Sequence, residues 1–218
     1  MLRYLLIRAL SLSLSLVVAS IVIFAVIEVI PGDPAAFMLG LNATEDAIAN
    51  LRAELGLGGS LVERYVSWIT GMLQGDFGTS ISLRQDVATI VLSRLPATLE
   101  LSLLALLIAV LIGGSAAIFA ARFRDTPAEA TVDVADGIAL SIPDFLWGLT
   151  FILVFGVAFP IFEISGRVSP RLALPFVSNF YLFEAIVRLR FDLVLDLLSH
   201  MLMPALALAL PLAAVIAQ

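Results

Sequence analysis

Residues 97–121 read ATLELSLLALLIAVLIGGSAAIFAA, and Glu100 is the one charged residue among them. A backbone that crosses the hydrocarbon core of a bilayer must satisfy its polar groups internally, which an α-helix does within a single segment. A core about 30 Å thick needs roughly 20 apolar residues in a helix. The length and character of this stretch therefore predict a transmembrane helix.

Three further stretches have the same character: residues 9–30, 137–162 and 199–217. Together the four stretches contain three charged side chains, which are Glu28, Glu100 and Asp144. The whole chain is 61% hydrophobic and 14% charged, whereas soluble domains have about 25% charged residues. We therefore expect an all-α fold, a polytopic membrane helix bundle with four transmembrane helices and an extracytoplasmic helical insertion.

The composition also excludes several kinds of chemistry. The sequence has no cysteine and one histidine, which excludes disulfides, thiolate catalysis and a multi-histidine metal site. All 12 basic residues are arginine, so there is no Walker phosphate loop and no Schiff-base lysine. A net charge of -6 without a basic cluster argues against nucleic acid as a partner. We expect no catalytic residue, no metal and no cofactor in this chain.

The first apolar stretch, residues 9–30, has two interpretations. Arg3 and Arg8 precede it and Ala19-Ser20 resembles a cleavage region, as in a secretory signal peptide. The hydrophobic region of a signal peptide is about 7–15 residues long. Because this stretch is longer, the sequence favours an uncleaved membrane anchor.

The arginines of the short connections indicate the orientation. Arg3 and Arg8 precede the first predicted helix, and Arg122 and Arg124 follow the second, on the same side of the membrane. Cytoplasmic connections carry an excess of basic residues, so we expect a multi-pass protein with a cytoplasmic amino terminus. The predicted parts are residues 1–30 (cytoplasmic tail and first transmembrane helix), 31–96 (extracytoplasmic helical segment) and 97–218 (a core with three transmembrane helices).

The extracytoplasmic segment is predicted to fold. Thr44 begins a helix that ends near Gly56, and Ser60 with Glu63 forms a capping box for a second helix that ends near Gly75. A third amphipathic stretch follows over residues 85–95. These helices either lie on the membrane or on the transmembrane helices, or they form a platform for an external partner.

Asp144 is the strongest candidate for function within the predicted helices. It follows Pro143 inside the third apolar stretch, and an ionisable group at membrane depth usually faces a cavity or the bundle interior. Pro143 removes a main-chain hydrogen bond and can kink the helix. We therefore take Ser141, Pro143 and Asp144 as candidates for lining a translocation pathway. The alternative is that the helix begins near Phe145 and leaves Asp144 at the interface.

The other ionisable residues of the apolar stretches lie near predicted helix ends. Solvation at the membrane interface explains Glu28 and Glu100, and His200 is expected at an interface as well. Arg167 lies in a second external stretch, residues 163–198, where arginines and acids are equal in number. Small residues recur at helical spacing in the second and fourth stretches, which predicts closely packed helices: Gly113, Ala117 and Ala121, and Ala205, Ala209, Ala213 and Ala217.

A set of short motifs resembles one family, the inner-membrane permease subunits of binding-protein-dependent ABC importers in the dipeptide, oligopeptide and nickel branch. The motifs occur in the family's order: Ile30-Pro31-Gly32-Asp33-Pro34, Leu55-Gly56-Leu57, Gly75-Asp76-Phe77-Gly78-Thr79-Ser80, Arg94-Leu95-Pro96-Ala97-Thr98-Leu99-Glu100-Leu101, Ser141-Ile142-Pro143-Asp144-Phe145 with Gly148, Gly166-Arg167, and His200 through Met203-Pro204-Ala205-Leu206.

The resemblance implies a permease of the inner membrane that pairs with a second homologous permease and two cytoplasmic ATPases. An extracytoplasmic solute-binding protein would deliver a small peptide-like solute, and Asp33, Asp76 and Phe77 are the candidates for contacting it. The resemblance also implies a coupling loop and two further transmembrane helices after the point where this sequence stops, Gln218. We therefore expect a chain truncated before the coupling loop.

Two alternatives from other classes stay open at this stage. A non-transporting membrane scaffold would use the external helices to bind a partner and would need no path for a solute. An intramembrane hydrolase would need a nucleophile paired with a base inside the transmembrane helices, and His200 is the sole histidine available.

Overall fold

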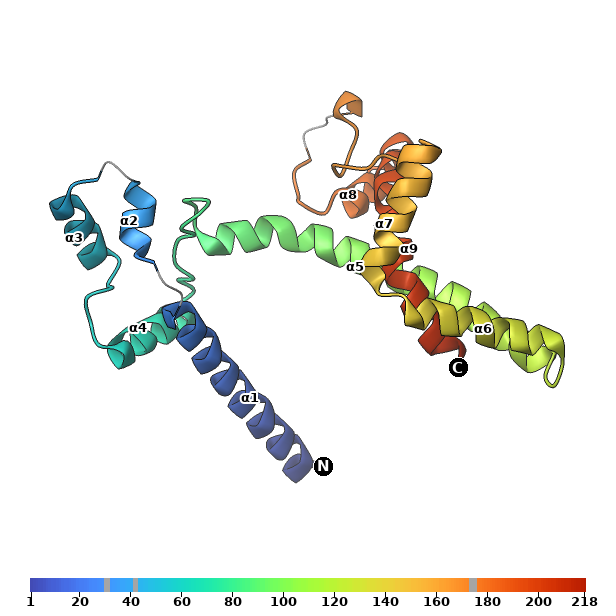
Figure 1. Ribbon diagram of the computed structural model, residues 1–218, viewed down its shortest axis with the longest axis horizontal. Helices are drawn as coiled ribbons and strands as arrows, with labels where there is room; N and C mark the ends of the chain where they lie inside the picture. The colour runs from blue at the N-terminus through green and yellow to red at the C-terminus, as the bar shows by residue number, and fades with distance from the viewer. Residues whose placement is uncertain (30–31, 41–42, 173–175) are drawn as a thin grey trace. The chain divides into compact units, whose positions relative to one another are not determined.

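The computed structural model describes residues 1–29, 32–40, 43–172 and 176–218. Ile30 and Pro31, where the first predicted boundary falls, lie outside the described residues. The helices in order are α1 (Leu2–Val29), α2 (Pro34–Leu39), α3 (Glu45–Glu54), α4 (Leu61–Leu73), α5 (Val87–Arg122), α6 (Pro127–Ser141), α7 (Asp144–Phe151), a π-helix (Ile152–Ala158), a 3-10 turn (Pro170–Leu172), α8 (Tyr181–Val187) and α9 (Phe191–Ala217) (Figure 1). The fold of these residues is all-α.

The chain divides into two compact units, Met1–Val91 and Leu92–Gln218. The first unit holds α1 to α4, and the second holds most of α5 together with α6 to α9. The predicted parts at residues 1–30, 31–96 and 97–218 were defined by the side of the membrane on which each segment is expected. The division into two units does not test that assignment, which stays a prediction.

In the first unit, α4 packs against the carboxyl-terminal half of α1. The ring of Phe24 lies 5.4 Å from that of Tyr65 and 6.0 Å from that of Trp68, measured between centroids. The hydroxyl groups of Ser20 and Tyr65 are 2.8 Å apart. The amphipathic second helix of the external segment therefore lies on an apolar helix, which is one of the arrangements that the sequence allowed.

The predicted helix caps are confirmed. Thr44 Oγ1 accepts a hydrogen bond from the backbone N–H of Ala47, and α3 begins at Glu45, the residue after Thr44. Ser60 Oγ accepts from the N–H of Glu63, while Glu63 Oε2 accepts from the N–H of Ser60 at 2.9 Å, which is the reciprocal capping box. These local hydrogen bonds satisfy amides that have no partner within the first helical turn.

The third amphipathic stretch does not form a helix of its own. α5 runs without interruption from Val87 through Pro96 to Arg122. Proline lacks an N–H and so removes one main-chain hydrogen bond, yet the apolar run on its carboxyl-terminal side continues the helix. The predicted transmembrane helix over residues 97–121 is therefore the larger part of a longer helix.

The apolar stretch over residues 137–162 is broken at Pro143, the residue at which the sequence indicated a kink, and its second helix begins beside Phe145, where the alternative interpretation began it. α6 ends at Ser141, and a second segment of α7 and the π-helix begins at Asp144, bent by 97° relative to α6. Ile142 has extended backbone angles, φ -96° and ψ 120°, because the ring of Pro143 disfavours the helical conformation in the residue before it. By length and apolar character, the described helices include three that can cross a membrane, or four if this bent pair counts as one crossing.

The second unit is organised around α9, which contacts α6, α7 and α8. It also meets α5, where Ala109 packs against Ala209 and Ala213 in a buried cluster. A Cβ atom added at Gly113 would lie 2.4 Å from the carbonyl oxygen of Ala213. The small residues at helical spacing thus bring two backbones close together, as expected for helices that pack within lipid.

Candidate functional site

A buried carboxylate on α5 is the centre of the polar site in the second unit. The side chain of Glu100 is 7% exposed. Its Oε2 accepts a hydrogen bond from Arg167 Nη2 at 3.1 Å, and its Oε1 accepts from the backbone N–H of Phe183 at 3.0 Å. The expectation of interfacial solvation at Glu100 is wrong, because protein groups replace water at both oxygens.

Arg167 reaches Glu100 from the connection between the π-helix and α8. Its Nη2 also donates to the carbonyl oxygen of Asn179 at 3.1 Å. The guanidinium carbon lies 4.0 Å from the centre of the Tyr181 ring, a cation–π contact, and Tyr181 in turn stacks on Phe176 at 4.2 Å. The ion pair therefore ties α5 to α8 and to the segment before it.

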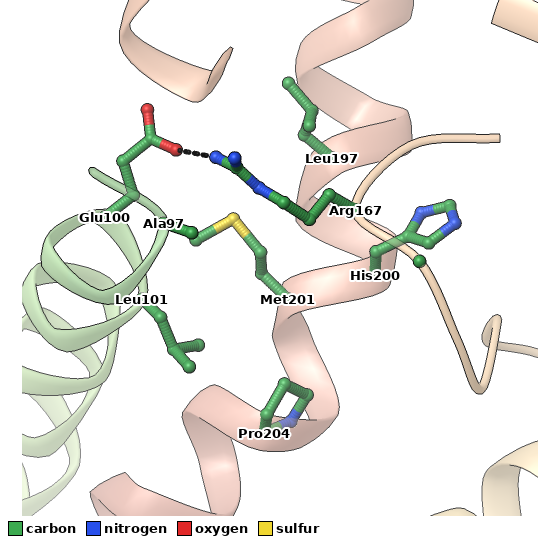
Figure 2. A pocket seen from close by; sticks show the side chains of 9 residues that line it. Ala97, Glu100, Leu101, Arg167, Leu197, His200, Met201 and Pro204 are labelled. Carbon is green, nitrogen blue, oxygen red and sulfur yellow. Dashed lines mark hydrogen bonds and ion pairs between the residues drawn. The ribbon is translucent and has the colours of Figure 1, made fainter. Parts of the chain in front are cut away.

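A cavity lies beside this ion pair (Figure 2), and a second cavity shares part of its lining. The first, of about 150 Å³, is lined by Ala97, Glu100, Leu101, Gly166, Arg167, Leu197, His200, Met201 and Pro204. The second, of about 290 Å³, is lined by Gly148, Ile152, Glu163, Ile164, Ser165, Gly166, His200, Met203 and Pro204. Gly166, His200 and Pro204 line both cavities, so these residues form a wall that the two cavities share.

His200, which lines both cavities, is buried, and its position at a membrane interface stays a prediction. Its Nδ1 lies 2.8 Å from the backbone carbonyl oxygen of Asp196, one turn earlier in α9. A carbonyl oxygen can only accept, so Nδ1 carries the proton in the neutral ring and Nε2 is left as an acceptor. The carboxylate of Asp196 accepts from the N–H and the hydroxyl of Ser169, which fixes the start of α9 to the preceding segment.

This geometry opposes the intramembrane hydrolase. Ser199 Oγ lies 3.4 Å from His200 Nδ1 but donates to the carbonyl oxygen of Asp196 at 2.6 Å. Since Nδ1 is itself a donor, it cannot take the proton of Ser199 in this arrangement. In the part of the chain that the structure describes, no group of three or more histidine, aspartate or glutamate side chains is placed to hold a metal ion.

The pathway candidates from the sequence lie at the break between α6 and α7. Pro143 and Asp144 line a groove of about 490 Å³ together with Leu140 of α6, Ile142 of the break, and residues of α5 and α9: Ser102, Ala105, Leu208, Pro211 and Leu212. Asp144 Oδ1 accepts from the N–H of Phe145 at 2.8 Å, at the first turn of α7. Ser141 is not among the lining residues, and its hydroxyl donates to the carbonyl oxygen of Gly137. Their role stays a prediction.

In the first unit, Asp33 is engaged within the chain. Its Oδ1 caps α2 by accepting from the N–H of Ala35 at 3.1 Å, and its Oδ2 accepts from Arg52 at 2.5 Å. The hydrogen bond from Arg52 holds the pKa of Asp33 below its ordinary value. Nearby, Glu28 pairs with Arg64 at 2.7 Å and so is not merely solvated. Both pairs line a cavity of about 530 Å³.

The second predicted contact region of this unit follows α4. Asp76 Oδ1 accepts from the N–H of Gly78 at 2.9 Å and so shapes the turn that contains Phe77. The positive φ angles at Gly75 and Gly78, 87° and 75°, are ones that glycine adopts without strain. The ring of Phe77 is 46% exposed. Of the three external candidates, Phe77 has the apolar exposed surface that a protein partner would cover.

Sequence reasoning missed the pairing of Glu100 with Arg167. The partners are 67 residues apart, and no local periodicity joins them. A signal was nevertheless present, because a lone carboxylate inside an apolar helix is costly unless a cation or a donor meets it, and Arg167 lies in one of the two predicted external stretches that each contain four arginines.

Comparison with known proteins identifies relatives of the whole chain. Residues 1–102 match the family described as "Binding-prot-dependent transport system membrane comp, N-term". The chain is 34% identical over 199 residues, 90% of its length, to the "Probable D,D-dipeptide transport system permease protein DdpB" of Escherichia coli (strain K12). It is 32% identical over 194 residues, 88% of its length, to the di/tripeptide transport system permease protein of Pseudomonas aeruginosa (strain UCBPP-PA14).

A third relative matches along all 218 residues, with 30% identity, and is the dipeptide transport system permease protein of Alkalihalophilus pseudofirmus (strain ATCC BAA-2126 / JCM 17055 / OF4). The chain spans 58% of the length of the first two relatives and 66% of the third. Its apolar helices are those of a multi-pass membrane protein. The chain belongs to the membrane permeases of binding-protein-dependent ABC importers.

Proposed function

We propose that the protein is the permease subunit of an ABC importer that carries peptides or similar small solutes across the inner membrane. In this proposal a second homologous permease completes the pathway, and two cytoplasmic ATPases drive it. An extracytoplasmic solute-binding protein delivers the solute. No bond of the solute is made or broken, so the chain is not an enzyme.

The observation that carries this proposal is the similarity of the chain, along 88% to 100% of its length, to permeases of dipeptide and di/tripeptide transport systems. The architecture supports it. Cavities lie between α5, α7 and α9, and the buried pair of Glu100 and Arg167 lies in the wall of one of them. A scaffold that only binds partners has no need of polar groups inside its helix bundle, where they are costly.

Two regions of the chain take part in this proposal. The groove at Pro143 and Asp144, with Ser141 at the end of α6 beside it, forms part of the translocation pathway. The turn at Asp76 and Phe77 contacts the solute-binding protein, and Asp33 supports the same unit through its bond to Arg52. The amino terminus lies in the cytoplasm.

The transport proposal is tested in the native organism. Disruption of the gene should abolish ATP-dependent uptake of radiolabelled dialanine, and the gene supplied in trans should restore it. The tagged protein should co-purify with a second permease and an ATPase. Unchanged peptide uptake together with failure to co-purify would reject the proposal.

The two regions are tested in the same cells with matched variants. Asp144→Asn should slow uptake, whereas Asp133→Asn, at an exposed position of α6, should not. Phe77→Ala should weaken stimulation of ATP turnover by the solute-binding protein. Phe37→Ala removes another exposed ring of the same unit and is the control. Equal behaviour of a variant and its control would remove that region from the proposal.

A further inference from the structure

Glu100 and Arg167 form a neutral pair of opposite charges in the wall of the 150 Å³ cavity. Most of the other lining residues are apolar, among them Ala97, Leu101 and Met201, as Figure 2 shows. A charge pair in such surroundings is retained only where each charge meets a counter-charge and further hydrogen-bond partners. In this structure Glu100 is the counter-charge of Arg167, and Arg167 is the counter-charge of Glu100.

Each charge keeps an anchor that does not depend on the pair. Glu100 Oε1 holds the N–H of Phe183, and Arg167 holds the carbonyl oxygen of Asn179 and the ring of Tyr181. Among the described residues, all hydrogen bonds from Arg167 leave from Nη2. Both edges of a guanidinium that can hold a carboxylate with two parallel hydrogen bonds include Nη2, so a fork becomes possible when the bond from Nη2 to Glu100 opens and Nη2 donates together with Nη1 or Nε.

From this arrangement we infer that the cavity binds a zwitterionic peptide, whose free amino and carboxyl termini replace the Glu100–Arg167 pair. The ammonium group of the peptide lies at Glu100 Oε2, and the terminal carboxylate lies at Arg167. The anchors at Phe183, Asn179 and Tyr181 hold the two side chains while their mutual bond opens. This inference rests on the proposed transport function and names the chemical class of its solute.

The space beside the pair suits such a ligand. The cavity next to it, of about 290 Å³, shares Gly166, His200 and Pro204 with the first, so a bound peptide extends past α9 toward α7. Pockets for small molecules have volumes of roughly 300–1,000 Å³, and the second cavity alone, of about 290 Å³, is close to the lower end of that range. The apolar lining from Ile152, Ile164 and Met203 accepts side chains of differing shape.

Recognition of both termini follows from electrostatics. A solute with one charge would break the pair and leave either the buried Glu100 or the partly exposed Arg167 without a counter-charge, which is unfavourable and most so for Glu100. A zwitterion supplies both counter-charges, so the site stays neutral whether it is empty or occupied. Selection therefore includes rejection of a wrong solute as well as attraction of the right one.

The test measures binding to the assembled transporter in nanodiscs without the solute-binding protein, so that the selectivity of that protein does not enter. Three probes are compared by equilibrium dialysis: dialanine, N-acetyl-dialanine, which keeps only the carboxylate, and dialanine amide, which keeps only the ammonium group. The variants are Glu100→Gln and Arg167→Gln. Arg190→Gln, which removes an exposed arginine paired with Asp192, is the matched control.

The wild-type complex and Arg190→Gln should bind dialanine at least about tenfold more tightly than either blocked probe. Arg167→Gln should reverse this preference toward dialanine amide, because Glu100 is left without a counter-charge. Glu100→Gln should reverse it toward N-acetyl-dialanine. Opposite reversals of this kind cannot arise from a general loss of folding, which would weaken all three probes alike.

The inference is overturned if the wild-type complex binds the three probes equally or not at all, or if both variants change the three affinities in parallel. If cells with the native transporter still import dialanine, such binding results would reject the proposed site at Glu100 and Arg167 but would not contradict the transport function. Absence of dialanine uptake by the native transporter would instead reject the transport function itself.

Discussion

The backbone of Gly113 on α5 lies directly against Ala213 on α9, so closely that a Cβ atom at Gly113 would be 2.4 Å from the carbonyl oxygen of Ala213. It would also lie 2.9 Å from the Cβ atom of Ile216. Neither neighbour is the mobile end of a long side chain, so the two helices would have to separate. The absence of a side chain at this position is therefore a condition for the packing of α5 on α9.

Substitution Gly113→Ala should destabilise the protein in detergent by about 1–3 kcal/mol, as overpacking does in closely packed interiors. The reason is steric and does not depend on helix propensity, which favours alanine over glycine. Thermal unfolding of the purified protein measures the effect. Gly114→Ala is the matched control, since a Cβ atom there meets nothing within 4 Å. Equal melting temperatures for the two variants would contradict the close approach.

The pairing of Glu100 with Arg167 predicts strong thermodynamic coupling. Removing one charge leaves the other without its partner, so Arg167→Leu, which leaves the 7% exposed Glu100, should cost about 3 kcal/mol, and Glu100→Leu somewhat less because the remaining Arg167 side chain is 34% exposed. The double variant should be more stable than the sum of the two losses implies. Denaturant or thermal unfolding of all four proteins gives the coupling energy, and a value near zero would exclude a shared interaction.

These features differ in how far the sequence foretold them. The caps at Thr44 and Ser60 were predictable, because the donor and acceptor are within three residues and depend on local chemistry alone. The small-residue contact of Gly113 followed from spacing along one helix. The ion pair of Glu100 with Arg167 joins residues that are 67 positions apart in the sequence, and no pattern of neighbouring residues predicts a contact over that separation.

The bend at Pro143 shows a different limit. The apolar run over residues 137–162 has the length of a membrane crossing, and the sequence left open whether the helix is kinked at Pro143 or begins near Phe145. Locally, Pro143 excludes Ile142 from the helical conformation, and α7 restarts at Asp144. The groove beside Asp144 results from this break and from the packing of α5 and α9 around it. That packing cannot be predicted from the composition of the sequence.

Glu184 on α8 should make stability depend on pH. Its carboxylate accepts from the N–H of Val177 at 3.0 Å, and from the N–H and hydroxyl of Ser178 at 2.8 and 2.7 Å. These hydrogen bonds lower the pKa of Glu184 from its ordinary 4.5 to about 2. Because the folded pKa is the lower one, the stabilisation is complete above about pH 4.5 and is lost as the pH falls toward about 2.

The melting temperature of the wild-type protein should therefore fall more steeply over this range than that of Glu184→Gln, which cannot titrate. The variant should be the less stable protein at pH 7, since an amide can accept at one oxygen only. Glu54→Gln, at an exposed position of α3, should keep the full wild-type response. Identical pH profiles for the wild type and Glu184→Gln would show that these hydrogen bonds do not form in solution.

The arginines near the helix ends predict the orientation of the chain, which labelling can test. The sequence contains no cysteine, so a single introduced cysteine reports one position. Glu54→Cys lies at the exposed end of α3, before α5, and Arg124→Cys lies in the exposed turn that follows α5. Since α5 has the length and apolar character of a membrane crossing, the two positions should lie on opposite sides of the membrane.

A membrane-impermeant maleimide applied to intact spheroplasts should label Glu54→Cys at once, and Arg124→Cys only after the membrane is permeabilised. This result is expected because basic residues favour the cytoplasmic side, and Arg3 and Arg8 precede the first predicted crossing while Arg122 and Arg124 follow the second. Reaction of Glu54→Cys from the cytosol alone would invert the whole arrangement. It would place the turn at Phe77 on the cytoplasmic face, where no extracytoplasmic binding protein can reach it.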